Sequence, residues 1–366
     1  MPAFRVARRV LMDAAAARVF PGAVIEVGNQ SGVLWREACG RLTFDETAPE
    51  TSEQTIFDLA SLTKVLVTSL LAMRMVDRGR LRLERRVADI LPSWRRPDRR
   101  DVRLAELLAH ASGLPAHRPF YETCAGRAAY DAAIGAEPLE FEPGTRSLYS
   151  DLGFIALGFA LEDLAGQPLD AQFGNLRDVI ESGETVLSGA GPSIEIGFAV
   201  PASAPDRVAP TRGTDATRGL VHDENAEALG GVTGHAGLFG TAGAVGTIAR
   251  WMLRSVVGTT PGRGLATQST AVRFVSKAGI PGSSRALGWD TMLPTSSCGT
   301  RMSPRAFGHT GHTGTSLWID PDAGLYVVQL TNRVYPGGGS TEDITRFRRA
   351  FHDAVMADVR SSNPRA

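Results

Sequence analysis

The sequence predicts an α+β or α/β fold, with a central antiparallel sheet flanked by the N- and C-terminal helices and a large, mainly helical insert. Two observations predict it. Strand-like segments gather towards the two ends of the chain, whereas apolar helical runs fill the middle. Each end also carries an amphipathic helix, and the two helices can cover one face of the sheet while the insert covers the other. At 366 residues the chain can bury a large core.

The N-terminal part begins with apolar residues at the 3.6-residue spacing of an amphipathic helix. Two apolar strands follow, joined by a polar, glycine-containing hairpin connection. A second apolar helical run ends at Gly79, which suits a C-terminal cap. The expected elements are therefore a helix within 1–20, strands over 23–28 and 32–40, a loop over 45–55 and a helix over about 61–78.

The remaining elements continue the pattern of a helical middle and a strand-rich end. We expect helices over 102–110 and 154–164, loops and short strands over 180–220, a helix over about 236–256, an extended segment over 307–310, strands over 316–320 and 324–331, and a closing helix over 341–360. Residues 1–57 and 285–366 would form a sheet subdomain, and residues 58–284 a mainly helical one. We expect the active site in the cleft between them.

Composition excludes several classes of partner. The net charge is +0, so no basic field points to nucleic acid or to an anionic membrane. No apolar run approaches the ~20 residues of a membrane span, and residues 1–20 do not resemble a signal peptide, so we expect a cytoplasmic protein. The cysteines Cys39, Cys124 and Cys298 are odd in number and widely spaced, which disfavours a disulfide framework or a zinc site.

The most informative stretch carries Ser61 and Lys64 three residues apart at the start of an apolar helical run. All but two of the 39 Lys and Arg residues are arginine, and Lys64 is one of the two exceptions. Arginine keeps its proton, whereas a buried lysine can become a neutral amine and act as a base. Side chains at i and i+3 share a helix face, so a nucleophile and a base would meet here. The alternative is a helix-capping serine followed by a solvated lysine.

A second candidate stretch is Tyr149-Ser150-Asp151, ahead of a helix. A tyrosine beside a positive lysine can have its pKa lowered and carry a proton. Alternatively, Ser150 or Asp151 caps the helix and Tyr149 packs on the core.

A third stretch runs from His309 through Thr310 and Gly311 to His312. Glycines at every third position would expose backbone N–H groups that can bind an oxyanion. Two alternatives compete: a plain glycine-rich hairpin, or a metal site that also uses His222, Asp223 and His235. Neither His-x-His nor His-Glu-x-x-His occurs, so we predict no metal and no cofactor. Residues 221–239, dense in glycine and polar groups, could line the same cleft.

The chain lacks the Gly-x-Ser-x-Gly of α/β-hydrolases and has no phosphate-binding loop. Instead it resembles the serine β-lactamase and penicillin-binding-protein superfamily, closest to the branch of class C β-lactamases, family VIII carboxylesterases and D-Ala-D-Ala carboxypeptidases. The family's three motifs are matched in order by Ser61-Leu62-Thr63-Lys64, Tyr149-Ser150-Asp151 and His309-Thr310-Gly311. Supporting phrases extend the resemblance from about residue 20 to residue 336.

The resemblance implies roles for these residues. Ser61 would attack an acyl carbonyl, and Lys64 and Tyr149 would share the proton transfer, with the formal base left open. The backbone N–H groups of Ser61 and His312 would form the oxyanion hole, and water would hydrolyse the acyl-enzyme. The substrate-binding residues would be Asp151, His309, Thr310 and Gly311.

Two departures from the family pattern affect the expected substrate. Asp151 stands where the family often has asparagine, and its charge would hold Lys64 protonated more firmly. His309 stands where β-lactamases usually have a lysine that holds the substrate carboxylate. Histidine would do this only when protonated, below about pH 6.5.

The departures favour a carboxylesterase acting on small esters, with weak β-lactam hydrolysis. The alternatives are a β-lactamase or D-Ala-D-Ala carboxypeptidase acting on a β-lactam or amide, and a non-catalytic penicillin-binding-like module. The expected partner is a small molecule, with no nucleic acid and no membrane, and the sequence does not define the oligomeric state.

Overall fold

The computed structural model describes residues 4–188, 194–201, 204–213, 218–260 and 264–362. Its centre is a six-stranded antiparallel sheet with the strand order β2-β1-β9-β8-β7-β6. The strands are β1 (Gly22–Asn29), β2 (Gly32–Gly40), β6 (Asp290–Thr291), β7 (Phe307–Thr310), β8 (Ser316–Asp320) and β9 (Leu325–Thr331). The N-terminal hairpin therefore sits beside strands from the far end of the chain, which confirms the predicted fold class.

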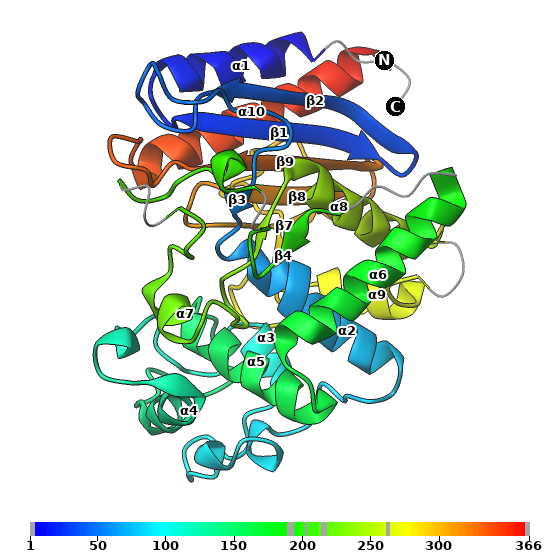
Figure 1. Ribbon diagram of the computed structural model, residues 1–366. Helices are drawn as coiled ribbons and strands as arrows, with labels where there is room; N and C mark the ends of the chain where they lie inside the picture. Colours follow the sequence, from blue (N-terminus) through cyan, green and yellow to red (C-terminus); the bar gives the residue numbers. More distant parts are fainter. Residues whose placement is uncertain (1–3, 189–193, 202–203, 214–217, 261–263, 363–366) are drawn as a thin grey trace.

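Helices cover both faces of this sheet. The terminal helices α1 (Arg5–Ala16) and α10 (Thr341–Ser362) pack together on one face, and α8 (Ala242–Val257) packs against β1 and β9 on the other (Figure 1). Alternation along β1 explains the two cores, because successive strand residues point to opposite faces. Ile25 and Val27 join the core under α1 and α10, whereas Val24 joins the larger core that includes α8.

The remaining helices and short strands lie mainly below the sheet in Figure 1. A small sheet has the strand order β3-β5-β4. Its strands are β3 (Phe57–Asp58), β4 (Ile196–Gly197) and β5 (Phe239–Gly240), and the helices are α2 (Leu70–Asp77), α3 (Leu104–Leu108), α4 (Gly126–Ala136), α5 (Asp151–Ala165), α6 (Leu169–Ser188), α7 (Glu224–Ala228) and α9 (Gln268–Val275). Short 3₁₀ turns cover Val87–Asp89, Pro92–Trp94, Phe120–Glu122 and Pro205–Arg207. The predicted division into two subdomains stays a prediction.

Helix α5 is longer than the predicted helix over 154–164, because it begins at Asp151, directly after its cap. The hydroxyl of Ser150 accepts the N–H of Gly153 at 3.2 Å, which is an N-cap hydrogen bond. Gly166 ends the helix at φ 66°, a left-handed conformation that glycine adopts without a steric penalty. The predicted cap therefore falls on Ser150, and the first helical residue is Asp151.

Three further predicted elements differ from the structure. The helix over 61–78 is a turn, then a π-helix over Lys64–Ser69 whose six residues are all buried, and then α2. Part of the predicted loop over 180–220 is instead the end of α6, which continues to Ser188. The helix over 236–256 begins only at residue 242, because Phe239 and Gly240 pair in the small sheet. Residues 189–193, 202–203 and 214–217 of that loop lie outside the described residues.

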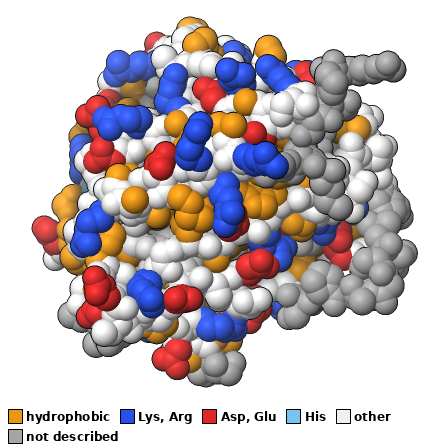
Figure 2. All heavy atoms as spheres, turned by 90° about the horizontal axis from the view of Figure 1, so that it is seen from above, with side chains coloured by type: hydrophobic (Ala, Val, Ile, Leu, Met, Phe, Trp, Pro, Cys, Tyr) orange, Lys and Arg blue, Asp and Glu red, His pale blue; other side chains and the backbone are white. Residues whose placement is uncertain are grey.

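The surface agrees with the neutral composition. Figure 2 views the molecule from above, the side of α1 in Figure 1, and shows positive and negative side chains interspersed on this face. Over the ranges that the structure describes, no helix combines the length and apolarity needed to cross a bilayer.

Candidate active site

Ser61 lies in a tight turn between β3 and the π-helix. The preceding residue, Ala60, has a left-handed backbone at φ 47°, a conformation that costs a non-glycine residue roughly 1–2 kcal/mol. Asp58 holds this turn, because its carboxylate accepts the N–H of Ala60 at 2.8 Å and that of His222 at 2.7 Å. Burial raises the pKa of Asp58 to about 6, although these two N–H groups oppose the shift.

Lys64 lies beneath Ser61, with a fully buried side chain. Its ammonium donates to Ser61 Oγ at 2.9 Å, to Asp151 Oδ1 at 2.7 Å and to the His235 carbonyl at 3.1 Å. Burial alone would lower the pKa of Lys64. The charge of Asp151 and the interaction with Tyr149 both raise this pKa, and together they outweigh the effect of burial, so the pKa of Lys64 is raised. Asp151 therefore holds the lysine protonated, as its place in the sequence predicts.

Tyr149 contacts the same serine and lies next to Lys64. Its hydroxyl donates to Ser61 Oγ at 2.7 Å, and Lys64 Nζ lies 4.9 Å from the ring centroid. The expectation of a lowered pKa is wrong: burial raises the pKa of Tyr149, and the nearby Lys64 charge does not compensate. Ser61 Oγ thus accepts hydrogen bonds from two protonated groups, and one of them must lose its proton before it can take that of Ser61.

The turn after β7 brings the predicted oxyanion donors to the nucleophile. The hydroxyl of Thr313 donates to the Asp58 carbonyl at 2.8 Å, and that of Thr315 donates to the Leu59 carbonyl at 3.1 Å. Among the described residues, the backbone N–H groups of Ser61 and His312 donate to no other backbone or side-chain atom. Both N–H groups are thus available to a substrate oxygen.

Gly311 lies where this turn and the nucleophile segment approach most closely. A Cβ atom at this position would overlap the hydroxyl of Thr315 and come within 2.8 Å of the carbonyl of Leu59. Glycine is therefore required for the close approach.

His309 lies in the cavity wall but is only 3 % exposed. Its Nδ1 is 2.8 Å from the carbonyl oxygen of Thr310, which can only accept, so Nδ1 carries the proton and Nε2 is an unpartnered acceptor. Burial, with the charges of Arg285 and Lys64, holds the pKa of His309 well below 6.5. The expectation of a cationic His309 below about pH 6.5 is therefore wrong.

Arginines supply the positive charge that His309 lacks. Arg285 lines the cavity with its guanidinium carbon 5.2 Å from the Tyr149 ring centroid, and it forms no ion pair with a carboxylate among the described residues. Arg348 donates to the carbonyls of Gly311 and Thr315 at 2.8 Å each, and burial lowers its pKa to about 9. No sequence signal singles out these two residues in a chain so rich in arginine.

The residues of the alternative metal site make other contacts. His235 Nε2 lies 2.9 Å from Asp223 Oδ1, and its Nδ1 lies 2.8 Å from the hydroxyl of Thr233. The ring of His222 stacks on that of His312 with centroids 5.7 Å apart. Within the described ranges, no group of three or more His, Cys, Asp or Glu residues is arranged to hold a metal ion.

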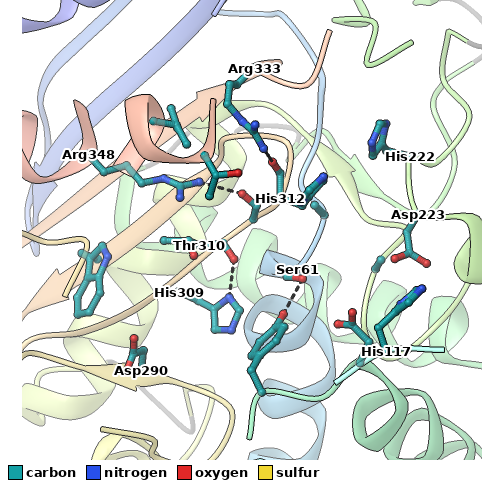
Figure 3. A pocket seen from close by; sticks show the side chains of 18 of the residues that line it. Ser61, His117, His222, Asp223, Asp290, His309, Thr310, His312, Arg333 and Arg348 are labelled. Atoms are coloured by element: carbon teal, nitrogen blue, oxygen red, sulfur yellow. Dashed lines mark hydrogen bonds between the residues drawn. The ribbon is translucent and has the colours of Figure 1, made fainter. Parts of the chain in front are cut away.

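One cavity of about 530 Å³ gathers these groups. Figure 3 shows Ser61 near its centre, with His309 on one side and Asp223 on the other. Of the residues predicted from the sequence, the cavity is lined by Ser61, Tyr149, Asp151, His309, Thr310, Gly311 and His312, while Lys64 lies behind Ser61. Residues 222–224 and Ala236 of the stretch 221–239 also line the cavity, as predicted, and the residues that the sequence analysis missed are His117, Arg285, Asp290, Arg333 and Arg348.

The fold thus places Ser61, Lys64 and Tyr149 in contact, as the three sequence motifs predict. The chain belongs to the Beta-lactamase family, whose model matches residues 7–350. An Escherichia coli K12 protein named "Putative D-alanyl-D-alanine carboxypeptidase" is 30% identical over 86% of this chain and 79% of its own length. An N-acetylmuramyl-L-alanine amidase of Bacillus subtilis strain 168 is also 30% identical, over 86% of this chain and 77% of its own length.

Solved structures share the fold at lower identity. A class C beta lactamase from Rhodobacter sphaeroides matches with a TM-score of 0.73 and 20% identity, over 96% of this chain and 99% of that one. EstCE1, a hydrolase with promiscuous acyltransferase activity, matches with a TM-score of 0.72 and 21% identity, over 97% and 99%. The predicted resemblance to the β-lactamase and penicillin-binding superfamily is therefore confirmed, and the chain is a member of a family of serine hydrolases.

Proposed function

We propose that the protein is a carboxylesterase that hydrolyses small acyl esters through an acyl-enzyme on Ser61, with weak activity on β-lactams. One observation carries the proposal: Ser61 Oγ lies within hydrogen-bond distance of both Lys64 Nζ and the Tyr149 hydroxyl. A serine hydroxyl becomes a useful nucleophile when an adjacent group can remove its proton. Both candidate groups meet the serine at the wall of an open cavity.

The proposed reaction has two halves. Ser61 Oγ attacks the acyl carbonyl while its proton passes to the Lys64–Tyr149 pair, and the N–H groups of Ser61 and His312 hold the oxyanion. Removing one such donor costs on the order of 10²–10³ in rate. The same pair returns the proton to the leaving group, and water then hydrolyses the acyl-enzyme.

The test is a substrate panel of short p-nitrophenyl esters, nitrocefin and a D-Ala-D-Ala peptide. The proposal expects the highest kcat/KM on the esters. It also expects a fluorophosphonate probe to label Ser61, which mass spectrometry of the labelled protein would detect. A probe that labels no residue, together with no turnover on the whole panel, would favour the non-catalytic binding module. Faster turnover of the peptide than of the esters would favour a carboxypeptidase.

Asp151 is expected to set the pH at which the enzyme works. In Asp151→Asn the ammonium of Lys64 loses the charge that raises its pKa, so the pKa falls. The same carboxylate raises the pKa of Tyr149, so both candidate bases deprotonate at lower pH in the variant. The rise of kcat/KM with pH should therefore move to lower pH, and on that limb the rate gains about tenfold for each unit of pKa change.

The measurement is a pH–rate profile on a neutral ester. Glu224→Gln is a matched control, because this substitution also removes one negative charge from the cavity. Glu224 is exposed and does not contact Lys64. Its pH limb should stay where it is in the parent protein. A limb that moves to higher pH in Asp151→Asn, or moves equally in both variants, would contradict this role.

A second candidate function is hydrolysis of an amide whose leaving group carries a carboxylate. The guanidinium of Arg285, which pairs with no carboxylate in the described part of the chain, favours it, and the names of the E. coli and B. subtilis relatives support an amide bond. A carboxylate would pair with this guanidinium through charge-assisted hydrogen bonds.

Arg285→Gln is expected to separate the two functions. For a peptide with a free terminal carboxylate, KM should rise about 10–100-fold, the loss that a hydrogen bond between charged groups represents. For p-nitrophenyl acetate, which has no carboxylate, KM should change less than about twofold. The same peptide with an amidated terminus is the matched control. Equal effects on all three substrates would assign Arg285 a structural role.

A further inference from the structure

A second cavity, of about 340 Å³, lies at the far end of the helix that starts beside Ser61. It is bounded by α2 and the residues just after it, by the end of α5 and the residues after it, and by the beginning of α6, which lie below the large sheet in Figure 1. Three arginines line it: Arg74 in α2, and Arg78 and Arg80 just beyond. The amides of Gln167 and Asn175 complete its polar wall.

Arg74 is the informative member of this cluster. Arg74 is only 9 % exposed, and its Nη1 is buried without any hydrogen-bond partner among the described residues. No carboxylate of the described chain forms an ion pair with Arg74, Arg78 or Arg80. Burial and the neighbouring charge of Arg78 both lower the pKa of Arg74, as expected for cations gathered without an anion.

Other buried arginines in the chain are treated differently. Arg250 shares Glu184 with Arg254, and Arg99 pairs with Asp98. Arg333 and Arg348 lack a carboxylate, but they donate to backbone carbonyls and line the active-site cavity. Among the described residues, each buried arginine that forms no ion pair with a carboxylate thus lines a cavity.

A simpler explanation covers only part of the cluster. Arginines at a helix C-terminus interact favourably with the helix dipole. This accounts for Arg78 and Arg80, which are exposed beyond the last turn of α2. Arg74 lies in the last turn of α2 and also benefits from the dipole, but the dipole does not explain why its Nη1 is buried without a hydrogen-bond partner, which is costly.

We propose that this cavity is an anion-binding site for a small ligand that carries a phosphate group. Three guanidinium groups match a divalent tetrahedral anion, since guanidinium forms paired, charge-assisted hydrogen bonds to phosphate oxygens. Leu71 and Met75 give the cavity an apolar wall for the rest of the ligand, and the amides of Gln167 and Asn175 can bind its polar groups. The phosphate belongs to a soluble monoester or to a lipid headgroup. The proposal is independent of the reaction at Ser61.

The test is calorimetric titration of the full chain with inorganic phosphate at low ionic strength, where screening is weak. The parent protein and Arg82→Gln should bind equally, because Arg82 is an exposed neighbour that does not line the cavity. Arg74→Gln should bind about tenfold more weakly or worse. Phosphate-free Arg74→Gln should melt at the same temperature as the parent or higher, because no partner of Nη1 is lost.

The double variant Arg78→Gln/Arg80→Gln keeps the test valid if Arg74→Gln does not fold, since both side chains are exposed. It should weaken phosphate binding at least severalfold. Retention on vesicles that contain phosphatidic acid, lost in Arg74→Gln, would identify the lipid source. Binding of glycerol 3-phosphate without vesicle retention would identify the soluble one. No phosphate binding by the parent, or equal binding by parent and variants, would overturn the proposal.

Discussion

Replacing Ser61 by alanine is expected to lower kcat/KM for p-nitrophenyl butyrate by at least about 10³-fold, because only binding and the oxyanion donors would remain. The variant lacks a single oxygen, the one that accepts from both Lys64 Nζ and the Tyr149 hydroxyl. No acyl-enzyme can form on its side chain. The measurement is initial rate in purified protein, with mass spectrometry after the fluorophosphonate probe.

Ser31→Ala provides the control for this substitution. Ser31 is exposed in the connection between β1 and β2, and its side chain lies outside the cavity. It should keep the parent activity and the parent labelling. Undiminished hydrolysis by Ser61→Ala would show that Ser61 is not the nucleophile. Labelling of another residue in that variant would identify the nucleophile instead.

The second large effect is expected in Tyr149→Phe. The ring stays in place against His110, whose centroid lies 4.6 Å away, and only the hydroxyl at 2.7 Å from Ser61 Oγ is lost. Removing one participant in proton transfer costs about 10²–10⁴-fold. The loss should appear mainly in kcat for acylation, with little change in binding of a neutral ester, and stopped-flow measurement of the acylation burst can separate the two.

Tyr121→Phe is the matched control, since Tyr121 is 39% exposed and outside the cavity lining. It should leave the acylation burst as in the parent. A fall of less than about threefold in Tyr149→Phe would leave Lys64 as the sole proton acceptor. A loss confined to KM would make Tyr149 a substrate contact.

The contact between Ser61 and Lys64 follows from local sequence, whereas Tyr149 reaches Ser61 only through the tertiary fold, across 88 residues of chain. Ser61 and Lys64 meet because one helical turn separates them, and Asp151 follows Tyr149 at the start of a capped helix. Rules of this kind depend on covalent spacing and backbone hydrogen bonds. Such rules can therefore be applied to a sequence before its tertiary contacts are known.

The pKa shifts of His309 and Tyr149 could not be predicted in the same way, because burial is a property of the assembled fold. His309 resembles a titratable surface histidine in the sequence, but β7 buries it and holds its pKa low. Tyr149 has a raised pKa for the same reason. Arg285 reaches the cavity from a loop whose sequence has no distinguishing pattern, and no sequence pattern indicates the π-helix after Ser61.

The pairing of β1 with β9 has a consequence for biosynthesis. Ala23 lies opposite Thr331, so partners in the middle of the sheet are separated by roughly 300 residues of chain. Contacts of such large sequence separation form slowly, because a long loop must close first. On the ribosome the β1–β2 hairpin therefore waits for its neighbour until β9 has emerged. The turn that carries His312 lies between β7 and β8, so the proposed oxyanion hole is completed only after these later strands have been made.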